Sequence, residues 1–188
     1  MSEGFSPPGY AVFETAIGWI GMSWNERGLT ALQLPERDAA DTERRLRKRS
    51  GLDGPVALPP AARSIVESIC RYATGERVDF SDVPVELGGI DPFRLAVYAA
   101  ARHLGHGQTT TYGELAQAAG HPGLARETGT ALGQNPVPII IPCHRIVAAG
   151  GKLGGFSAHG GASAKQRLLA LESARPQASP GTQASFAF

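Results

Sequence analysis

The stretch VPIIIPCHRIV constrains the fold of this chain more than any other, because three consecutive isoleucines lie between two prolines. Proline fixes φ and lacks an N–H, so Pro138 and Pro142 exclude a helix across this stretch. A continuous apolar run is typical of a buried segment. We therefore expect a buried strand or an extended core segment. It leads directly into Cys143, His144 and Arg145.

The composition is that of a globular protein. Hydrophobic residues make up 42% of the 188 residues and charged residues 19%, which allows a core and argues against general disorder. At about 150 residues per domain, this length predicts one large domain or two small ones. No apolar run is long enough for a membrane span, and MSEGFSPPGY lacks the pattern of a secretory signal. Two cysteines, Cys70 and Cys143, are too few for a disulfide framework or a four-cysteine zinc site, so we expect a reducing, cytoplasmic setting.

Charge is divided unevenly along the chain, although the net charge is only +1. Residues 1–93 contain ten Lys and Arg against fourteen Asp and Glu, whereas residues 94–173 contain seven against three. All five histidines also lie in the second half. A basic second half favours a polyanionic partner, although a split of this size also arises by chance.

The first part of the chain, to about residue 90, predicts a small α/β unit. Apolar and β-prone residues recur between glycines and then give way to two helical patterns. We interpret the basic end of the first helix as a solvated surface and Cys70 in the second helix as a packing residue. The predicted elements are a strand meander over 10–34 with a turn at 25–28, helices over 38–50 and 60–75, and an extended edge segment over 79–87.

The second part is predicted to be mainly helical. Asp91 caps its first helix, and Thr111 with Glu114 forms the capping-box spacing T-x-x-E. Two short helices joined by a glycine-containing turn match a helix-turn-helix, although an ordinary helical hairpin has the same spacing. The expected elements are helices over 91–105, 112–119, 124–134 and 164–173, a glycine-rich loop over 150–163 and a disordered tail over 174–188.

Cys143 is either a buried structural cysteine or a nucleophile. A neighbouring cation favours the thiolate, and His144 offers a base. Adjacent residues of an extended segment point to opposite faces, so His144 needs a turn or a bridging water to reach the thiol. A base also needs an orienting partner. Glu172 is the best candidate, because Glu114 serves in a cap and Glu127 lies on a helix surface.

The run IPCHRIV, preceded by NPVPII and TTYGELA, resembles the O6-alkylguanine-DNA alkyltransferases, or methylated-DNA–protein-cysteine methyltransferases. The resemblance is close over 91–173 and loose over 10–90. It implies an α/β domain over 1–90 with a ribonuclease-H-like fold, and a mainly α domain over 91–173 with a winged-helix-like helix-turn-helix. It further implies a monomer that binds double-stranded DNA containing alkylated guanine, without a cofactor, a metal or a membrane.

The same resemblance implies the reaction and its residues. The alkyl group of O6-alkylguanine, and also of O4-alkylthymine, moves to Cys143 in a single-turnover, irreversible step. His144 is the water-linked base and Glu172 its orienting carboxylate. Asn135 braces the active-site turn, and Tyr112 contacts the target phosphate and the flipped base.

Arg126 matches the arginine that fills the gap left by the flipped nucleotide. Ala125 and Gly129 are small enough for close approach of the minor groove. Arg145 is expected to be structural. The expected substrate-pocket residues are Phe156, Ser157, Lys165 and Ile146.

The sequence departs from the family pattern in the pocket loop. Phe156 replaces the common tyrosine, and SAHGG replaces the shorter SGG. Residues 1–93 contain no histidine and only Cys70, so the zinc site of some relatives is not expected. The alternatives are a non-catalytic lesion-binding relative, a helix-turn-helix regulator with Cys143 in its core, and a Cys-His hydrolase.

Overall fold

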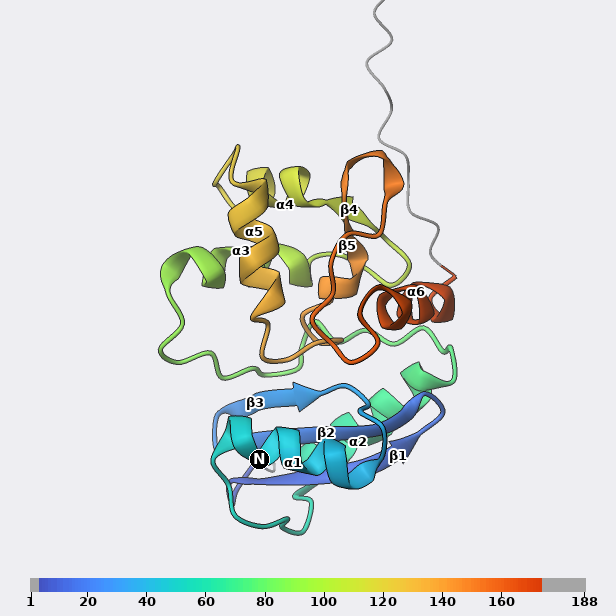
Figure 1. Cartoon of the computed structure of the whole chain (residues 1–188). Coiled ribbons are helices and arrows are strands. Elements are labelled where there is room, and N and C mark those ends of the chain that lie inside the picture. Colours follow the sequence, from blue (N-terminus) through green and yellow to red (C-terminus); the bar gives the residue numbers. More distant parts are fainter. Residues whose placement is uncertain (1–3, 174–188) are drawn as a thin grey trace, which may run out of the picture.

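The computed structural model describes residues 4–173. Figure 1 shows a sheet with its helices in the lower half and a mainly helical half above it. The predicted disordered tail, 174–188, lies outside the described residues. Within the described part of the chain, no helix is both long and apolar enough to cross a membrane.

The predicted meander is confirmed as a three-stranded antiparallel sheet in the order β1-β2-β3. Its strands are β1 (Gly9–Thr15), β2 (Gly18–Asn25) and β3 (Gly28–Gln33). Gly28 has a φ of 149°, and a Cβ there would lie 2.5 Å from the Pro84 carbonyl oxygen. This close approach lets Leu29 N donate to Pro84 O, and it holds the 79–87 segment along the edge of β3.

Two helices cover this sheet. α1 (Ala39–Ser50) packs on β2 and β3, and α2 (Pro60–Ala73) packs against β1. Asp38 caps α1 by accepting from Asp41 N, and Gly51 ends it in the left-handed conformation, with a φ of 69°. α2 buries one apolar face, which consists of Ala62, Ile65, Ile69, Tyr72 and Ala73.

The predicted helices of the second half are also confirmed, with bounds that shift by a few residues. They are α3 (Pro92–Arg102), α4 (Tyr112–Ala118), α5 (Ala125–Gly133) and α6 (Gly161–Leu171). Both hydrogen bonds of the Thr111–Glu114 capping box are present at the start of α4. α4 and α5 pack against each other, and a short parallel pair, β4 (Thr110–Thr111) with β5 (Ile146–Val147), lies beside them.

The isoleucine stretch is buried as predicted, but it is mostly turn and not strand. Ile139 has a φ of 73°, and a 3-10 turn, η1 (Cys143–Arg145), follows. Pro138 and Pro142 each lack the N–H that a strand ladder needs. The chain therefore folds back on itself, with Ile141 N donating to Val137 O. A second 3-10 turn, η2 (Ala149–Gly151), follows β5.

One apolar cluster connects the two halves of the molecule. It joins buried side chains of the sheet and α2 to Val137, Ile139, Ile140 and Leu168. The 137–140 segment, which leads to Cys143, therefore packs against the N-terminal half.

Candidate active site

Asn135 holds the turn that precedes Cys143. Its Nδ2 donates to Ile141 O at 2.7 Å, and its Oδ1 accepts from Val137 N at 2.9 Å. Cys143 N donates to Ile141 O at 2.8 Å. A side-chain amide is both donor and acceptor, so one buried Asn closes both ends of the turn. The interpretation of Asn135 as a brace for this segment agrees with these contacts.

His144 lies in the 3-10 turn η1 and not in an extended segment. Its ring is fully buried, with Nε2 2.8 Å from Glu172 Oε1. A carboxylate accepts hydrogen bonds, so Nε2 carries the proton and Nδ1 carries a free lone pair. Nδ1 is buried and has no hydrogen-bond partner among the described residues. The ring is thus arranged as a base with its acceptor nitrogen unused.

Glu172 is the centre of a buried polar cluster. Arg145 donates to both of its oxygens from Nε and Nη2 at 2.9 Å, and Gly107 N donates to Oε2 at 3.0 Å. Burial alone would raise the pKa of this carboxyl, but the hydrogen bonds from His144 and Arg145 hold it well below its usual value. The prediction that Arg145 is structural agrees with these contacts.

Tyr72 on α2 is a member of this cluster that the sequence analysis missed. Its hydroxyl donates to Glu172 Oε1 at 2.8 Å and lies 3.3 Å from His144 Nε2. Burial and the Glu172 charge raise the pKa of Tyr72, so it remains a donor. The available signal was indirect: a tyrosine on the buried face of a helix needs a polar partner for its hydroxyl.

Cys143 is only 8% exposed, and burial raises the pKa of its thiol. A hydrogen bond from Asn135 and the charge of Lys165 act in the opposite direction. Burial also lowers the pKa of His144. The resting site is therefore a neutral thiol beside a neutral imidazole.

Lys165 is completely buried beneath the glycine-rich loop. Its Nζ donates to Ile146 O at 2.5 Å, to Tyr112 Oη at 3.3 Å and to Gly155 O at 3.4 Å. Burial lowers the pKa of Lys165 to about 8. This ammonium holds α4, β5 and the loop together and places a positive charge near the thiol.

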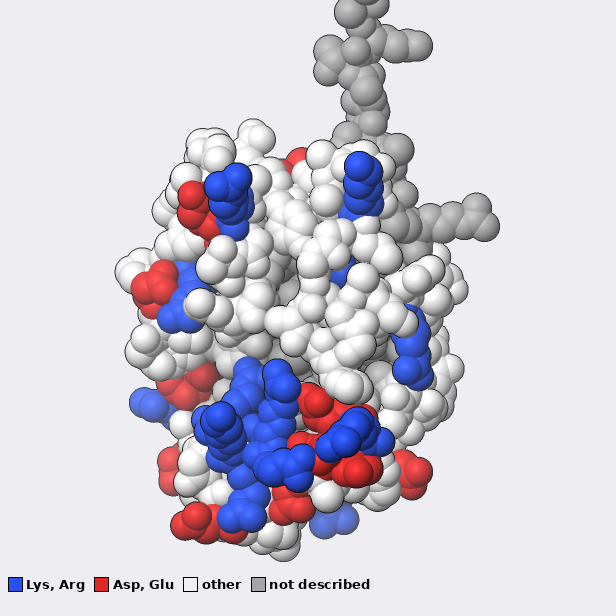
Figure 2. All heavy atoms as spheres, in the orientation of Figure 1, with Lys and Arg blue, Asp and Glu red and all other residues white. Residues whose placement is uncertain are grey.

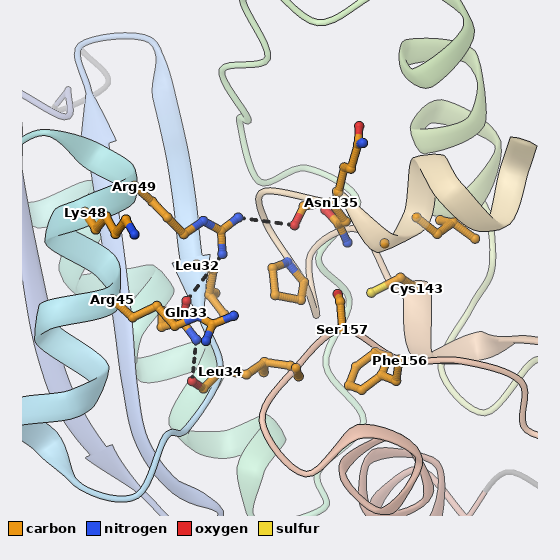
Figure 3. A pocket seen from close by; sticks show the side chains of 15 residues that line it. Leu32, Gln33, Leu34, Arg45, Lys48, Arg49, Asn135, Cys143, Phe156 and Ser157 are labelled. Carbon is orange, nitrogen blue, oxygen red and sulfur yellow. Dashed lines mark hydrogen bonds between the residues drawn. The ribbon is translucent and has the colours of Figure 1, made fainter.

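Cys143 lies between two cavities. The first, of about 560 Å³, is lined by Tyr112 of α4 and by Ala125, Arg126 and Gly129 of α5. The second, of about 550 Å³, lies toward α1 and β3 (Figure 3). Both cavities share Leu132, Gly133, Cys143, Phe156 and Ser157. The thiol is thus reached from the α5 side and from the groove between the two halves.

Arg126 is exposed in the first turn of α5, and its side chain has no hydrogen bond or ion pair among the described residues. Ala125 and Gly129 beside it leave the helix surface open. A Cβ at Gly129 would make only ordinary contact with the Tyr112 ring, at 3.6 Å, so packing alone does not require a glycine there.

Comparison with known proteins places the chain in a family. Residues 92–174 match the family described as "6-O-methylguanine DNA methyltransferase, DNA binding domain". A methylated-DNA–protein-cysteine methyltransferase of Mycolicibacterium paratuberculosis is 34% identical over 163 residues, which are 87% of this chain and 91% of that relative. The chain belongs to the methylated-DNA–protein-cysteine methyltransferase family. A family member from Mycobacterium tuberculosis is 42% identical over 120 residues, 64% of this chain and 70% of that relative.

Solved structures agree with this membership. The crystal structure of Mycobacterium tuberculosis OGT in complex with DNA has a TM-score of 0.71 at 34% identity, and the match covers 90% of this chain and 95% of that chain. An O6-methylguanine-DNA methyltransferase from Pyrococcus kodakaraensis, 24% identical, has a TM-score of 0.67 and shares the fold. The coarse α/β architecture is therefore that of the methyltransferase family.

Of the four substrate-pocket residues that the family resemblance implies, two line the cavities and two do not. Phe156 and Ser157 line both cavities beside Cys143. Ile146 and Lys165 line neither of them. Ile146 lies in the core and offers only its carbonyl, to Lys165, while Lys165 reaches the lining through Tyr112 and Gly155.

The basic end of α1 is exposed to solvent, as interpreted from the sequence. Three of its residues, Arg45, Lys48 and Arg49, also line the second cavity, together with Cys143. Arg49 reaches the second half of the chain, where it donates to Asn135 O and Pro136 O at 3.3 Å. Helical periodicity gave no sign of this, because the contact joins residues more than eighty positions apart.

Proposed function

We propose that this chain removes the alkyl group from O6 of guanine in DNA by transferring it, once and irreversibly, to Cys143. The main observation behind this proposal is the arrangement at η1. Cys143 is buried but lines a cavity, and the next residue, His144, is hydrogen-bonded to Glu172 and has no partner for Nδ1 among the described residues. Membership of the methyltransferase family, and the DNA complex of the similar Mycobacterium tuberculosis OGT, support this function.

The α5 face is the proposed DNA contact. O6 of guanine is paired inside the duplex, so the base must leave the stack to react. A cavity of about 560 Å³ is within the range of small-ligand sites, about 300–1,000 Å³, and it opens beside Arg126. Ala125 and Gly129 allow the backbone of α5 to approach a groove, and Arg126 is free to enter the gap in the stack.

The proposed chemistry balances without a cofactor. The thiol proton passes to His144 Nδ1, directly or through one water, and Glu172 stabilises the imidazolium. The sulfur attacks the alkyl carbon, so that an S–C bond forms as the C–O6 bond breaks. Guanine leaves with the electron pair and takes a proton, for which the Tyr112 hydroxyl, next to Lys165, is a suitable donor. His144 then releases its proton to solvent and Tyr112 regains one, so the net change is thiol plus alkylguanine to thioether plus guanine. The thioether product has no leaving route by hydrolysis, so each molecule reacts once.

Intact-protein mass measurement after incubation with O6-methylguanine DNA tests this function. We expect one CH₂ unit to be added per molecule, on the peptide that contains Cys143. Cys70 provides an internal comparison, because burial and Glu67 raise its pKa and no base adjoins it. Repeated turnover, or label on Cys70, would overturn the proposal.

Finer features of the architecture belong to the same proposal. We propose domains over 1–90 and 91–173, with a ribonuclease-H-like arrangement in the first and a winged-helix-like arrangement in the second. The α1- and α2-covered sheet supports the first, and the packing of α4 on α5 beside the β4–β5 pair supports the second. We also propose a cytoplasmic monomer that accepts O4-alkylthymine, which presents a similar alkylated oxygen.

A further inference from the structure

The groove between the two halves is strongly unbalanced in charge. Arg45, Lys48 and Arg49 of α1 line it, and none of its lining residues is Asp or Glu. In Figure 3, Arg45 and Arg49 extend from α1 toward Asn135 and Cys143. In Figure 2, Lys and Arg gather over α1, at the lower edge of the hollow in this face.

Of these three cations, only Arg45 has a carboxylate partner among the described residues, and that partner is Glu36. Lys48 has no ion pair or hydrogen bond in this part of the chain. Within residues 4–173, Arg49 donates only to uncharged oxygens, namely the Asn135 and Pro136 carbonyls and Gln33 Oε1. Burial lowers the pKa of Arg49, and the like charge of Arg45 lowers it further.

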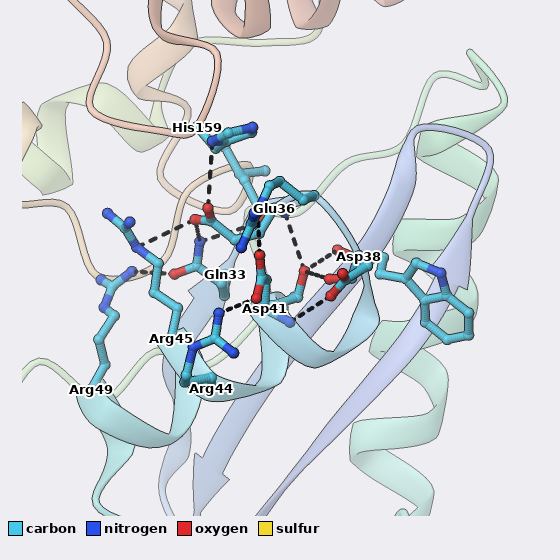
Figure 4. Close-up of polar contacts among 12 residues, drawn as sticks. Gln33, Glu36, Asp38, Asp41, Arg44, Arg45, Arg49 and His159 are labelled. Carbon is cyan, nitrogen blue, oxygen red and sulfur yellow. Dashed lines mark hydrogen bonds and ion pairs between the residues drawn. The ribbon is translucent and has the colours of Figure 1, made fainter.

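Among the described residues, Glu36 is the one acidic side chain that contacts these cations, and it also contacts Gln33 and His159 (Figure 4). It lies 3.3 Å from Arg45, and it accepts from Gln33 Nε2 at 3.0 Å. His159 is 3.6 Å from its other oxygen. The Glu36 carboxylate therefore offsets at most one of the three cations. The groove side of α1 keeps an excess of positive charge.

The groove is continuous with the reaction site. It shares five lining residues with the cavity on the α5 side, and Cys143 is one of them. If the flipped guanine enters the cavity from the α5 side, a long O6 substituent extends past Cys143 into the groove on the α1 side. Leu32 and Leu34 provide an apolar floor there, and the cations lie at the rim.

We propose that this groove is an oxyanion-binding subsite of the alkyl-transfer site. The oxyanion is either the charged far end of a larger O6 substituent or a phosphate of the bound DNA. Cations that line a groove and outnumber the nearby carboxylates attract such a group, and a hydrogen bond to a charged partner is stronger than a neutral one. This inference rests on the proposed function, because the groove is part of the site at which Cys143 accepts the alkyl group.

Matched substrates test the first source. Two duplex substrates are compared, one with O6-(3-carboxypropyl)guanine and one with O6-(3-carbamoylpropyl)guanine. The two substituents have nearly the same shape, but only the first is charged. We expect the wild type to react about tenfold faster with the acid than with the amide. In the double variant Arg45→Gln/Lys48→Gln this ratio should fall to near one. The control, Arg44→Gln/Arg47→Gln, removes two charges from the same helix outside the groove and should keep the wild-type ratio.

Salt dependence of binding to unmodified duplex tests the second source. If a phosphate occupies the groove, the rate ratio is near one in all proteins. The groove variant then loses about 0.9 from the slope of log K against log salt relative to the control variant. Equal rate ratios together with equal slopes would overturn the subsite. O6-methylguanine DNA is the reference substrate: failure of the wild type to accept its methyl group would overturn the proposed function instead.

Discussion

Single residues at this site have two roles, and Glu172 is the clearest case. The family resemblance implies that this carboxylate orients His144. In the structure the same carboxylate also neutralises Arg145 and accepts from Tyr72. Its removal therefore affects both the reaction and the fold, because a buried guanidinium would lose its counter-charge.

Glu172→Gln should slow alkyl transfer and also destabilise the protein. Breaking a buried ion pair typically costs about 3–5 kcal/mol, and Arg145 is only 5% exposed. Urea unfolding of the variant, next to a single-turnover assay, separates the two effects. A variant as stable as the wild type would show that Arg145 does not depend on this charge.

Tyr72→Phe is the cleaner probe of the same cluster. Without the phenol, Glu172 retains more negative charge for His144, so the pKa of His144 should rise from its lowered value. The imidazole must be neutral to take a proton. The low-pH fall of the transfer rate should therefore move to higher pH, and single-turnover rates between about pH 5 and 8 measure it.

Tyr10→Phe is the control for this change, because Tyr10 is equally buried and donates to another carboxylate, that of Glu43. It should leave the pH profile in place. Equal profiles for both variants and the wild type would mean that Tyr72 serves the fold alone.

At the scale of secondary structure, elements with local signals were predictable. The caps at Asp91 and Thr111 are sequence-adjacent to the helices that they start, and each is present. The turn around Cys143 was expected only from the family resemblance and not from local patterns, because its shape depends on the Asn135 side chain and on two prolines acting together. Periodicity describes repeating structure and carries no information about such a turn.

The first turn of α5 provides a prediction about recognition. Arg126→Ala should slow reaction with duplex O6-methylguanine DNA strongly, because base flipping costs a few kcal/mol that an inserted side chain partly offsets. Reaction with free O6-benzylguanine, which needs no flipping, should change little. Arg126→Lys should be intermediate, since it keeps the charge but loses the planar group.

Both substrates should be measured on the same protein preparations. Equal losses on both would indicate a pocket or folding defect. No loss on the duplex would return Arg126 to the role of an ordinary surface arginine.

At the scale of the whole molecule, the boundary near residue 90 remains a prediction, and the core that the two halves share was not predicted. Leu32 N donates to Pro136 O across the interface, and Tyr72 reaches the Glu172 cluster. These contacts join residues about a hundred positions apart in the chain. Helix and strand patterns report only which residues are buried, not which ones meet.

The shared core predicts that residues 91–173 are not stable alone. Val137, Ile139, Ile140 and Leu168 are all buried in a cluster with the first half, and burying one such side chain is worth about 1.5–3 kcal/mol. Losing half of this burial would remove about 3–6 kcal/mol, a large part of the 5–15 kcal/mol that stabilises a typical domain. Thermal unfolding of the fragment should therefore lack a sharp transition, and its alkyl transfer should be slow. Co-expression with residues 1–90 should restore both properties, whereas a fragment that melts near the full chain would show that the second half holds its own active-site turn.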